Sequence, residues 1–368
     1  MPFIDDIQIE QVPLCPVCST QGQARYSTLR DHTFGAPGSW GMNDCPSCSL
    51  MWLDPRPTPG DIAKVYRTYY THGVTAAGSA FQAHVRNTSL SRRLLHGVTA
   101  GIRRVQDAVL AIRFGYSQLR KGPMDAVLAW TLGLLPGMGQ GASMRVLGLR
   151  ASERGRILDI GCGNGAFLAC MKSLGWDTVG HEMDTVAAQF AREHFGLTVK
   201  EGLLADAGFA AGSFDVVTLS HVIEHVHVPS DLVDQCRQLL KPGGKLIVLT
   251  PNIDGIGHRV FREAWRGLEP PRHIHCFNVR TLRACVERGG MRVQRLRTPS
   301  RMMRAIWYAS RLIQRADRGE KMSNTAFDYL AAYAMQSLEG LACSLGAHLG
   351  EEVMLVAVRP KLHETSRS

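Results

Sequence analysis

The sequence predicts an α/β fold built on a mostly parallel sheet, and three observations support this prediction. Short apolar runs alternate with segments of helical periodicity between residues 155 and 298, which is the pattern of βαβ units. A glycine-rich turn, Gly161–Gly165, follows the first of these runs. Two Cys-x-x-Cys pairs precede the alternating region and predict a separate metal-binding module at the N-terminal end.

Seven strands are expected, each a short run rich in apolar residues. They are Arg156–Ile160, Thr178–Glu182, Leu197–Lys200, Phe214–Ser220, Lys245–Thr250, Met291–Leu296 and Val353–Val358. The helix before the fifth strand is expected to start after Ser230 as its N-cap and to end at Lys241–Gly244, where Pro and Gly stop a helix. If Val353–Val358 is the seventh strand, the helical residues 300–348 are an insertion between strands six and seven.

Differences in composition divide the chain into four parts. Residues 10–58 are rich in Cys, Pro and Gly and predict a zinc-binding module, whereas residues 61–150 predict a helical linker or cap. The alternating pattern assigns residues 151–299 and 349–360 to the sheet domain. Residues 300–348 complete the division as the helical insertion.

The glycine-rich turn is the strongest indication of a ligand site. Three glycines at alternate positions after Asp159 let the backbone turn sharply and let a ligand approach without a Cβ in the way. Glu182 ends the second strand, where an acid can accept hydrogen bonds from ribose hydroxyls. The pattern is DxGxGxG, not the GxGxxG of dinucleotide folds, which argues against a pyrophosphate ligand.

Together with its neighbours this turn resembles the class I S-adenosylmethionine-dependent methyltransferases, of the ubiquinone-pathway, methyltransferase-23-like type. The segments that carry the resemblance are Asp159–Gly165, Gly180–Glu182, Gly212–Asp215, His221–His225 and Leu240–Gly244. The resemblance covers about residues 155–298 and implies a methyltransferase with a Rossmann-like seven-stranded sheet and S-adenosylmethionine as its cofactor.

The resemblance also implies which residues bind the cofactor. Asp159, Gly161 and Gly163 would hold the methionine part, and Glu182 would hold the ribose. In many relatives an acid after the third strand contacts adenine, but Leu203 or Leu204 stands there in this chain, with Asp206 as a weaker substitute. The complete expected set is Asp159, Gly161, Cys162, Gly163, Gly165, Glu182, Leu203 and Ser220.

Four histidines near strand ends are candidates for the general base: His221, His225, His273 and His275. If the segment after the fourth strand turns helically, His221, Glu224 and His225 share one face, where they can move a proton or bind a metal. The alternative is that one or more of these histidines only cap or brace their loops.

Two local resemblances bear on these histidines. His221–His225 resembles the ExxEH motif of ubiquinone-pathway O-methyltransferases and small-RNA end methyltransferases, which can bind a divalent metal, although His221 replaces the first Glu. Trp265–His273 resembles a segment of methyltransferases that act in bacterial polysaccharide and sugar-modification pathways.

The two cysteine pairs predict a structural zinc site. Cys15, Cys18, Cys45 and Cys48 supply the four thiolates of a closed tetrahedral Zn²⁺ centre, and a module of this size with a small apolar core needs such a centre to fold. A redox pair, or plain cysteines, is the alternative. The arrangement resembles the N-terminal zinc module of deoxysugar C-methyltransferases, including the downstream residues Tyr66, Tyr69, Tyr70 and His72.

Charge and hydropathy restrict the partners. The 368 residues include 42 Lys and Arg against 32 Asp and Glu, a net charge of +10 that favours nucleic acid, a phosphate-bearing substrate or an acidic membrane. Met1–Glu10 lacks the features of a signal peptide, and no apolar run is long enough to span a bilayer. The expected location is the cytoplasm, with peripheral contact at the inner membrane as an extension of this prediction.

Two helical stretches have apolar faces that fit either a membrane or protein packing. In residues 86–121 an Arg-rich helix carries Leu94, Leu95, Val98, Ile102, Val105, Val109 and Ile112 on one face. In residues 331–345 the stripe is Ala331, Met335, Leu338, Leu341 and Leu345. Packing on the core or on a second subunit of a homo-oligomer is the favoured interpretation of both faces.

Three functions compete on this sequence. The first is methyl transfer to an oxygen, carbon or nitrogen of a small molecule, sugar or lipid-linked glycan, with a histidine removing the proton. The second is RNA methylation, in which the zinc module and the basic surface bind phosphates, although the basic residues lie mostly outside that module. The third is a non-catalytic scaffold that binds the cofactor.

Overall fold

The structure is a computed structural model, in which two compact units can be described. The described residues are 2–66, 89–135, 137–321 and 323–361, with the backbone alone at 89–98 and 326. One unit joins Met1–Tyr69 to Phe209–Ser368, and the other is Tyr70–Gly208. The four-part division by composition stays a prediction beside this division by contacts.

Seven strands form a mostly parallel sheet in the order β13-β14-β11-β10-β7-β8-β9. Their bounds are β7 Arg156–Ile160, β8 Asp177–Glu182, β9 Thr198–Glu201, β10 Phe214–Ser220, β11 Leu240–Pro251, β13 Arg292–Arg297 and β14 Glu352–Val358. The pairs β7 with β8, β8 with β9, and β10 with β11 are parallel, whereas β14 runs antiparallel to both β11 and β13. The predicted α/β class and all seven predicted strands are confirmed.

The helix before β11 differs from its prediction at both ends. It is α7, Pro229–Leu239, with Val228 as the N-cap and Pro at the first helical position. Because the fixed φ of Pro229 suits the first turn, the helix starts before Ser230 and not after it. The Lys-Pro-Gly-Gly segment lies inside β11, where the pairing with β10 shifts register between Phe214 and Val216.

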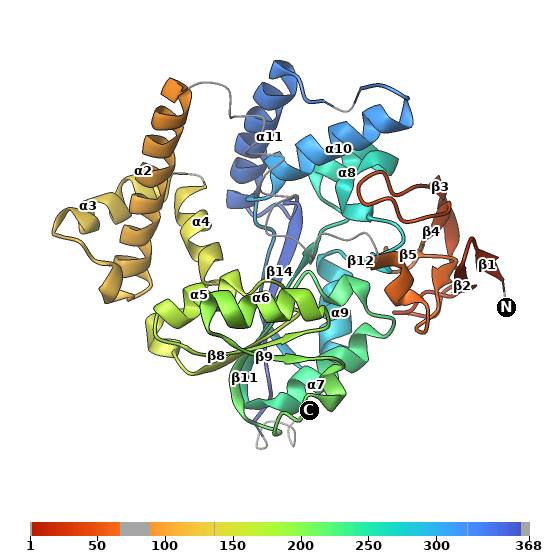
Figure 1. Cartoon of the computed structure of the whole chain (residues 1–368), viewed down its shortest axis with the longest axis horizontal. Helices are drawn as coiled ribbons and strands as arrows, with labels where there is room; N and C mark the ends of the chain where they lie inside the picture. Colours follow the sequence, from red (N-terminus) through yellow and green to blue (C-terminus); the bar gives the residue numbers. More distant parts are fainter. Residues whose placement is uncertain (1, 67–88, 136, 322, 362–368) are drawn as a thin grey trace. The chain divides into compact units, whose positions relative to one another are not determined.

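The second unit contains two groups of helices, one that packs on strands and one whose helices pack on each other. Helices α5 (Ala166–Ser173) and α6 (Thr185–Phe195) lie across one face of β8 and β9 (Figure 1). Helix α2 (Ser89–Arg113) packs against α3 (Met124–Trp130) and α4 (Met138–Arg145).

Two residues on the predicted apolar face of α2 are buried in the protein core. Val105 is 7% exposed and Val109 is fully buried, so core packing is confirmed for both residues and lipid contact is wrong for them. Leu94, Leu95 and Val98 lie outside the described side chains.

In the first unit, α10 (Met303–Asp317) and α11 (Ala326–Ser344) follow β13 and precede β14 in the chain and pack together, which confirms the helical insertion (Figure 1). Packing of the α11 stripe on the core of the chain is wrong, because Leu338, Leu341 and Leu345 are 57% to 81% exposed, whereas packing on a second subunit stays a prediction. Asp328 and Glu339 point inward instead, and Arg311 and Arg315 donate hydrogen bonds to the Asp328 carboxylate. No helix in the described ranges is long and apolar enough to cross a membrane.

The N-terminal module in the same unit is an all-β structure. Its larger sheet has the order β12-β5-β4-β3, and the strands of both small sheets are β1 Phe3–Ile4, β2 Ile7–Glu10, β3 Gln23–Leu29, β4 Trp40–Asp44, β5 Met51–Leu53, β6 Arg56–Pro57 and β12 His275–Cys276. Strand β12 comes from the segment after β11, so the module's sheet includes a strand from a distant part of the chain.

The module shares its hydrophobic core with residues that follow β11. Trp40, Met42 and Leu53 are fully buried beside Trp265 and Leu268. The module therefore does not depend on its own apolar residues alone, because residues 253–276 complete its core.

Candidate functional site

The turn after β7 is closed by backbone hydrogen bonds. Gly161 N and Cys162 N both donate to the carbonyl oxygen of His181, over 2.8 and 3.0 Å, which ties the turn to the end of β8. Gly163 has φ of 53°, in the left-handed region, and a Cβ built there would meet nothing within 4 Å. The backbone at Gly163 therefore favours glycine, and the space beside it is open to a ligand.

Two carboxylates accompany this turn. Glu182 Oε2 accepts a hydrogen bond of 2.7 Å from Gly163 N, and its Oε1 accepts from the backbone N–H groups of Met183 and Asp184. Asp159 is 4% exposed at the end of β7. Burial, together with the charges of Asp159 and Glu182, raises the pKa of Cys162. The turn therefore has a locally negative environment, which suits a ligand carrying positive charge.

Leu203, another predicted cofactor residue, is much less enclosed. Leu203 is 59% exposed and precedes the short 3₁₀ helix Leu204–Asp206. His181 directly precedes Glu182 and was not singled out from the sequence. It is buried, and burial lowers the pKa of its ring. The adenine contact remains a prediction, as does the role of Ser220 at the end of β10 in the other unit.

His221 follows β10 directly and lies between two carboxylates. Its φ of 56° is left-handed, and its Nε2 lies 2.9 Å from Glu352 Oε1 while its Nδ1 lies 3.3 Å from Glu224 Oε1. Burial opposes the charged form of His221, but Glu224 and Glu352 outweigh it and raise the pKa of the imidazole to about 10. At neutral pH both ring nitrogens therefore carry a proton, and the ring is positively charged.

Glu224 is held from several sides. It is 1% exposed, its Oε2 accepts a hydrogen bond of 3.0 Å from Thr250 Oγ1, and its backbone carbonyl accepts one of 2.8 Å from Ile274 N. Burial alone would raise the pKa of Glu224, but hydrogen bonding with His221 lowers it to about 2. The carboxylate is therefore ionised and fixed in place.

His225 and His273 lie together beside Glu224. Their ring centroids are 4.7 Å apart, and possible metal-ligand atoms of these three residues lie within 4.8 Å of one another. His225 Nδ1 is 3.0 Å from both Tyr66 Oη and the carbonyl oxygen of Arg272. His273 Nδ1 is 2.7 Å from the carbonyl oxygen of Gly267, and burial lowers the pKa of His273 to about 4.

His275 is not part of this group. It lies in β12, where it pairs with Trp52 of β5, and it is 1% exposed. Burial lowers the pKa of His275 to about 3. The structure therefore brings together three of the four histidines that the sequence marked, and leaves His275 inside the module's sheet.

A buried guanidinium supports the segment that carries His273. Arg272 is fully buried, and donates to Glu269 Oε1 over 3.0 Å, to Asp31 Oδ2 over 2.8 Å and to the carbonyl oxygen of Val65 over 3.2 Å. The Arg272 guanidinium also lies over the ring of Phe34, 4.4 Å from its centroid. The N-terminal module thus positions the backbone carbonyl that His225 uses.

The four cysteines converge as predicted. Cys15 Sγ lies 3.5 Å from Cys48 Sγ, Cys18 Sγ lies 3.3 Å from Cys45 Sγ, and all four sulfurs lie within 4.8 Å of one another. A tetrahedral zinc with Zn–S distances near 2.3 Å has S···S edges of about 3.8 Å, so the donor set fits this ion. The two knuckles match, because Ser19 and Ser49, each in the left-handed region, donate back to Cys15 and Cys45.

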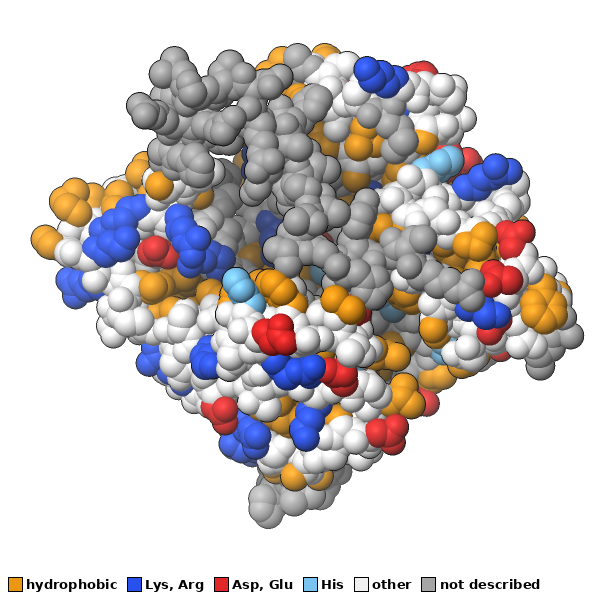
Figure 2. Space-filling view, viewed as in Figure 1, with side chains coloured by type: hydrophobic (Ala, Val, Ile, Leu, Met, Phe, Trp, Pro, Cys, Tyr) orange, Lys and Arg blue, Asp and Glu red, His pale blue; other side chains and the backbone are white. Residues whose placement is uncertain are grey.

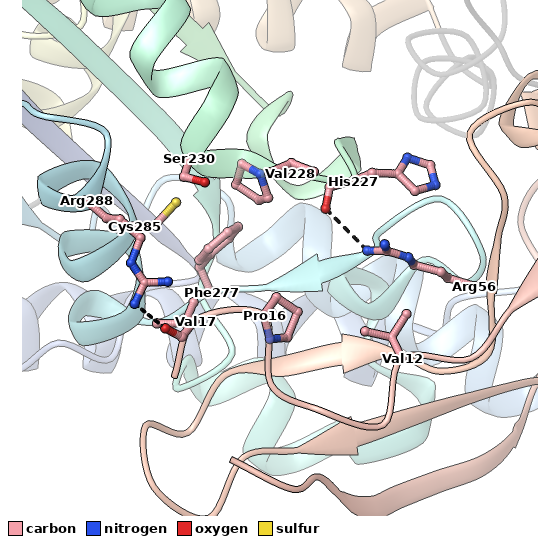
Figure 3. Close-up of a pocket in the computed structure, with 11 residues that line it drawn as sticks. Val12, Pro16, Val17, Arg56, His227, Val228, Ser230, Phe277, Cys285 and Arg288 are labelled. Carbon is pink, nitrogen blue, oxygen red and sulfur yellow. Dashed lines mark hydrogen bonds between the residues drawn. The ribbon is translucent and has the colours of Figure 1, made fainter. Parts of the chain in front are cut away.

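A cavity of about 270 Å³ lies elsewhere in the first unit, beside the first knuckle (Figure 3). Pro16 and Val17 line it together with residues that flank the start of α7 and with Cys285 and Arg288 of α9 (Val279–Arg288). Arg288 donates to the Val17 carbonyl, and Arg56 donates to the His227 carbonyl over 3.3 Å. None of the four candidate histidines lines this cavity.

Comparison with known proteins finds similarity over the sheet region. A family model described as a methyltransferase domain matches residues 142–296. Ubiquinone biosynthesis O-methyltransferases of Nitrosococcus oceani and Roseobacter denitrificans are 40% and 45% identical, each over 26% of this chain. The chain spans 44% and 41% of the length of these curated relatives.

Solved structures are similar only at low identity. A S-adenosylmethionine-dependent methyltransferase from Mesorhizobium loti is 18% identical with a TM-score of 0.38, over 55% of this chain and 90% of that one. A SAM-dependent methyltransferase from Archaeoglobus fulgidus is 17% identical with a TM-score of 0.40, over 60% of this chain and 93% of that one.

Proposed function

We propose that this chain, which carries a class I S-adenosylmethionine-dependent methyltransferase domain over residues 142–296, transfers a methyl group from that cofactor to a small-molecule acceptor. The observation that carries the proposal is the turn at Gly161–Gly165, open at Gly163 and accompanied by the carboxylates of Asp159 and Glu182. When bound, S-adenosylmethionine supplies an electrophilic methyl group on a sulfonium ion. Gly161 and Gly163 would admit its methionine part, and Glu182 would accept hydrogen bonds from its ribose.

Calorimetric titration with S-adenosylmethionine and with its demethylated product tests the cofactor site. The wild-type chain should bind both at micromolar concentration, and Asp159→Asn and Glu182→Gln should each weaken binding at least tenfold. Glu193→Gln, in the same unit and hydrogen-bonded to Gln189 of its own helix, is the matched control and should bind normally. Absence of binding by a folded, zinc-loaded wild type would contradict the proposal.

His225 is the proposed general base. Its Nδ1 is engaged by the Arg272 carbonyl and by Tyr66, which fixes the ring and leaves Nε2 as the nitrogen that accepts a proton. His221 is proposed to hold Glu224 and Glu352 in place, because its two ring nitrogens face their carboxylates. His273 would pack against the His225 ring and limit its rotation.

Substitution of His225 tests this assignment. His225→Gln should lower kcat by about 10²- to 10⁴-fold, the usual contribution of a positioned base, while cofactor affinity stays unchanged. Tyr66→Phe should give a smaller loss, because the Arg272 carbonyl still orients the ring. A kcat of His225→Gln within threefold of wild type would rule His225 out as the base.

A divalent cation is the second candidate role for the same residues, favoured by the convergence of Glu224, His225 and His273. In that case Glu224→Gln and His273→Gln would lower activity as strongly as His225→Gln, and added Mg²⁺, Mn²⁺ or Zn²⁺ would restore activity after chelation. If His225 acts as a base, activity is independent of these ions once the cysteine site is loaded.

The acceptor proposed first is the oxygen of a sugar or a lipid-linked glycan. The net charge of +10 supports an acceptor that bears phosphate, as lipid-linked sugars do. The four cysteines are proposed to hold a structural Zn²⁺, with no part in methyl transfer. Screening should compare lipid-linked sugars with phenolic acceptors, and methylation of phenols alone would contradict the glycan assignment.

A further inference from the structure

The second unit displays a dense group of exposed apolar side chains, here called the apolar knob: Met124, Val127, Trp130, Leu132, Leu134 and Leu135. All six belong to α3 and to the 3₁₀ turn Leu132–Leu134 with its C-cap, and each is between 44% and 62% exposed. Figure 2 shows apolar side chains standing out at the left edge of the view, where Figure 1 places α3. Single exposed apolar residues are ordinary, but six so close together in the chain indicate an interaction surface.

The knob is exposed because α3 packs on α2 through its opposite face. Asp125 and Ala129 are fully buried on that face, and Gly133 lies so close to α2 that a Cβ there would be 2.6 Å from Val109 Cγ2. The small residues let α3 and the following turn approach α2 closely. The large apolar side chains of the same segment are thereby directed outward, and they do not contribute to the core of the unit.

A cationic border accompanies the knob. Arg120 and Lys121 are exposed just before α3 in the chain, and the Arg113 guanidinium lies 5.3 Å from the centroid of the Trp130 ring. Lys and Arg clearly outnumber acids over residues 101–150, where the acids are Asp107 and Asp125. Both acids are already paired, Asp107 with Arg145 and Asp125 with Arg104, so they do not neutralise the border.

We propose that the apolar knob inserts into the headgroup region of a bilayer that contains anionic lipids. Apolar side chains around a tryptophan, bordered by lysine and arginine, match the two layers of such a surface, with acyl chains beneath and anionic headgroups above. The cationic border binds the headgroups while the knob enters the acyl boundary. A lipid-bound acceptor would then be delivered to a protein that already rests on its membrane.

The charge of the border disfavours a second copy of the chain as the occupant. A twofold-symmetric dimer would place the same face against itself, and the positive borders would meet each other. An anionic bilayer supplies the opposite charge instead. Charge complementarity therefore selects lipid over self-association.

Flotation with vesicles tests the proposal on the full chain. Vesicles that mix phosphatidylglycerol with phosphatidylcholine should carry the wild type at low salt, and pure phosphatidylcholine vesicles should carry at least tenfold less. Trp130→Ser combined with Leu134→Ser should weaken binding at least tenfold, as should Arg120→Glu combined with Lys121→Glu. The matched control is Phe327→Ser combined with Leu330→Ser, two exposed apolar residues of α11, which should bind as wild type does.

Three results would overturn the proposal. The wild type would fail to float with anionic vesicles at low salt, or the α11 control would lose as much binding as the knob variant. The third is a dimer in light scattering that the knob variant converts to a monomer, since a second copy would then be the occupant. Because all the substituted side chains are exposed, the variants should fold, and circular dichroism checks this.

Discussion

At the residue scale, three buried glutamates near the start of β14 have different pKa values because their partners differ. Glu352 lies between His221 and Arg301, which lower its pKa although burial opposes its ionisation. Glu351 accepts from Gly257 N and Trp265 Nε1, yet burial raises its pKa to about 7. Glu339 accepts a hydrogen bond from Glu351 N, and burial with the nearby charge of Glu351 raises its pKa to about 9.

Glu339 should make the stability of the chain depend on pH. The folded state holds this proton up to about pH 9, whereas the unfolded state releases it near the ordinary value of 4.5, so stability falls as pH rises between these values. Glu339→Gln removes the ionisable group and should raise Tm relative to wild type, by an amount that grows from pH 5 to pH 9.

The control for this measurement is Glu320→Gln, whose side chain is half exposed beside Arg318. It should shift Tm little and equally at every pH. A difference between Glu339→Gln and wild type that stays constant from pH 5 to pH 9 would show that Glu339 is ionised in the folded chain.

The sequence revealed residues whose chemistry is local and missed those that act through distant contacts. The glycine turn and the cysteine pairs are visible because their spacing alone brings the atoms together. Glu352 lies 131 residues from His221, and Asp31 lies 241 residues from Arg272. No local pattern marks such partners, so the ion pairs of Glu352 and Arg272 became visible only in the folded chain.

At the element scale, the start of one helix follows from a local preference and the exposed face of another follows from packing. The helix α7 starts at Pro229 because a fixed φ favours the first turn, and the exposed stripe of α11 reflects an inward face that is polar. The inward Asp328 satisfies two arginines of α10 and caps its own helix through Thr325. Periodicity located both helices but could not tell which face of α11 would be paired.

The two knuckles should need zinc in order to hold their shape. The expected content is about one Zn²⁺ per chain by mass spectrometry of metals, and Cys45→Ser should lower both that content and Tm. Cys343→Ser, a half-buried thiol of α11 outside the cluster, should change neither the zinc content nor, by much, Tm. Full zinc content in Cys45→Ser would contradict a four-cysteine site.

On the scale of the whole molecule, the sequence predicted the class of the fold and the order of its elements along the chain. The strand alternation and the late seventh strand were enough for this, because parallel strands need helical crossovers and each crossover leaves a periodic segment. The sequence could not show that a piece of chain after β11 joins the sheet of the N-terminal module. That pairing, His275 with Trp52 and Cys276 with Met51, joins segments too far apart in the chain for any local pattern to reveal it.

The buried position of Arg272 has a practical consequence for anyone who wishes to dissect this protein. A fragment cut to residues 142–296 would keep the whole matched region, and Glu269 with it, but would lose Asp31, Phe34 and Val65. The buried Arg272 guanidinium would then keep only one of its two carboxylate partners. Removing one partner of a buried ion pair typically costs about 3–5 kcal/mol. We therefore expect the region that sequence comparison matches to be unstable as a separate fragment. Any fragment meant to fold should include the N-terminal module.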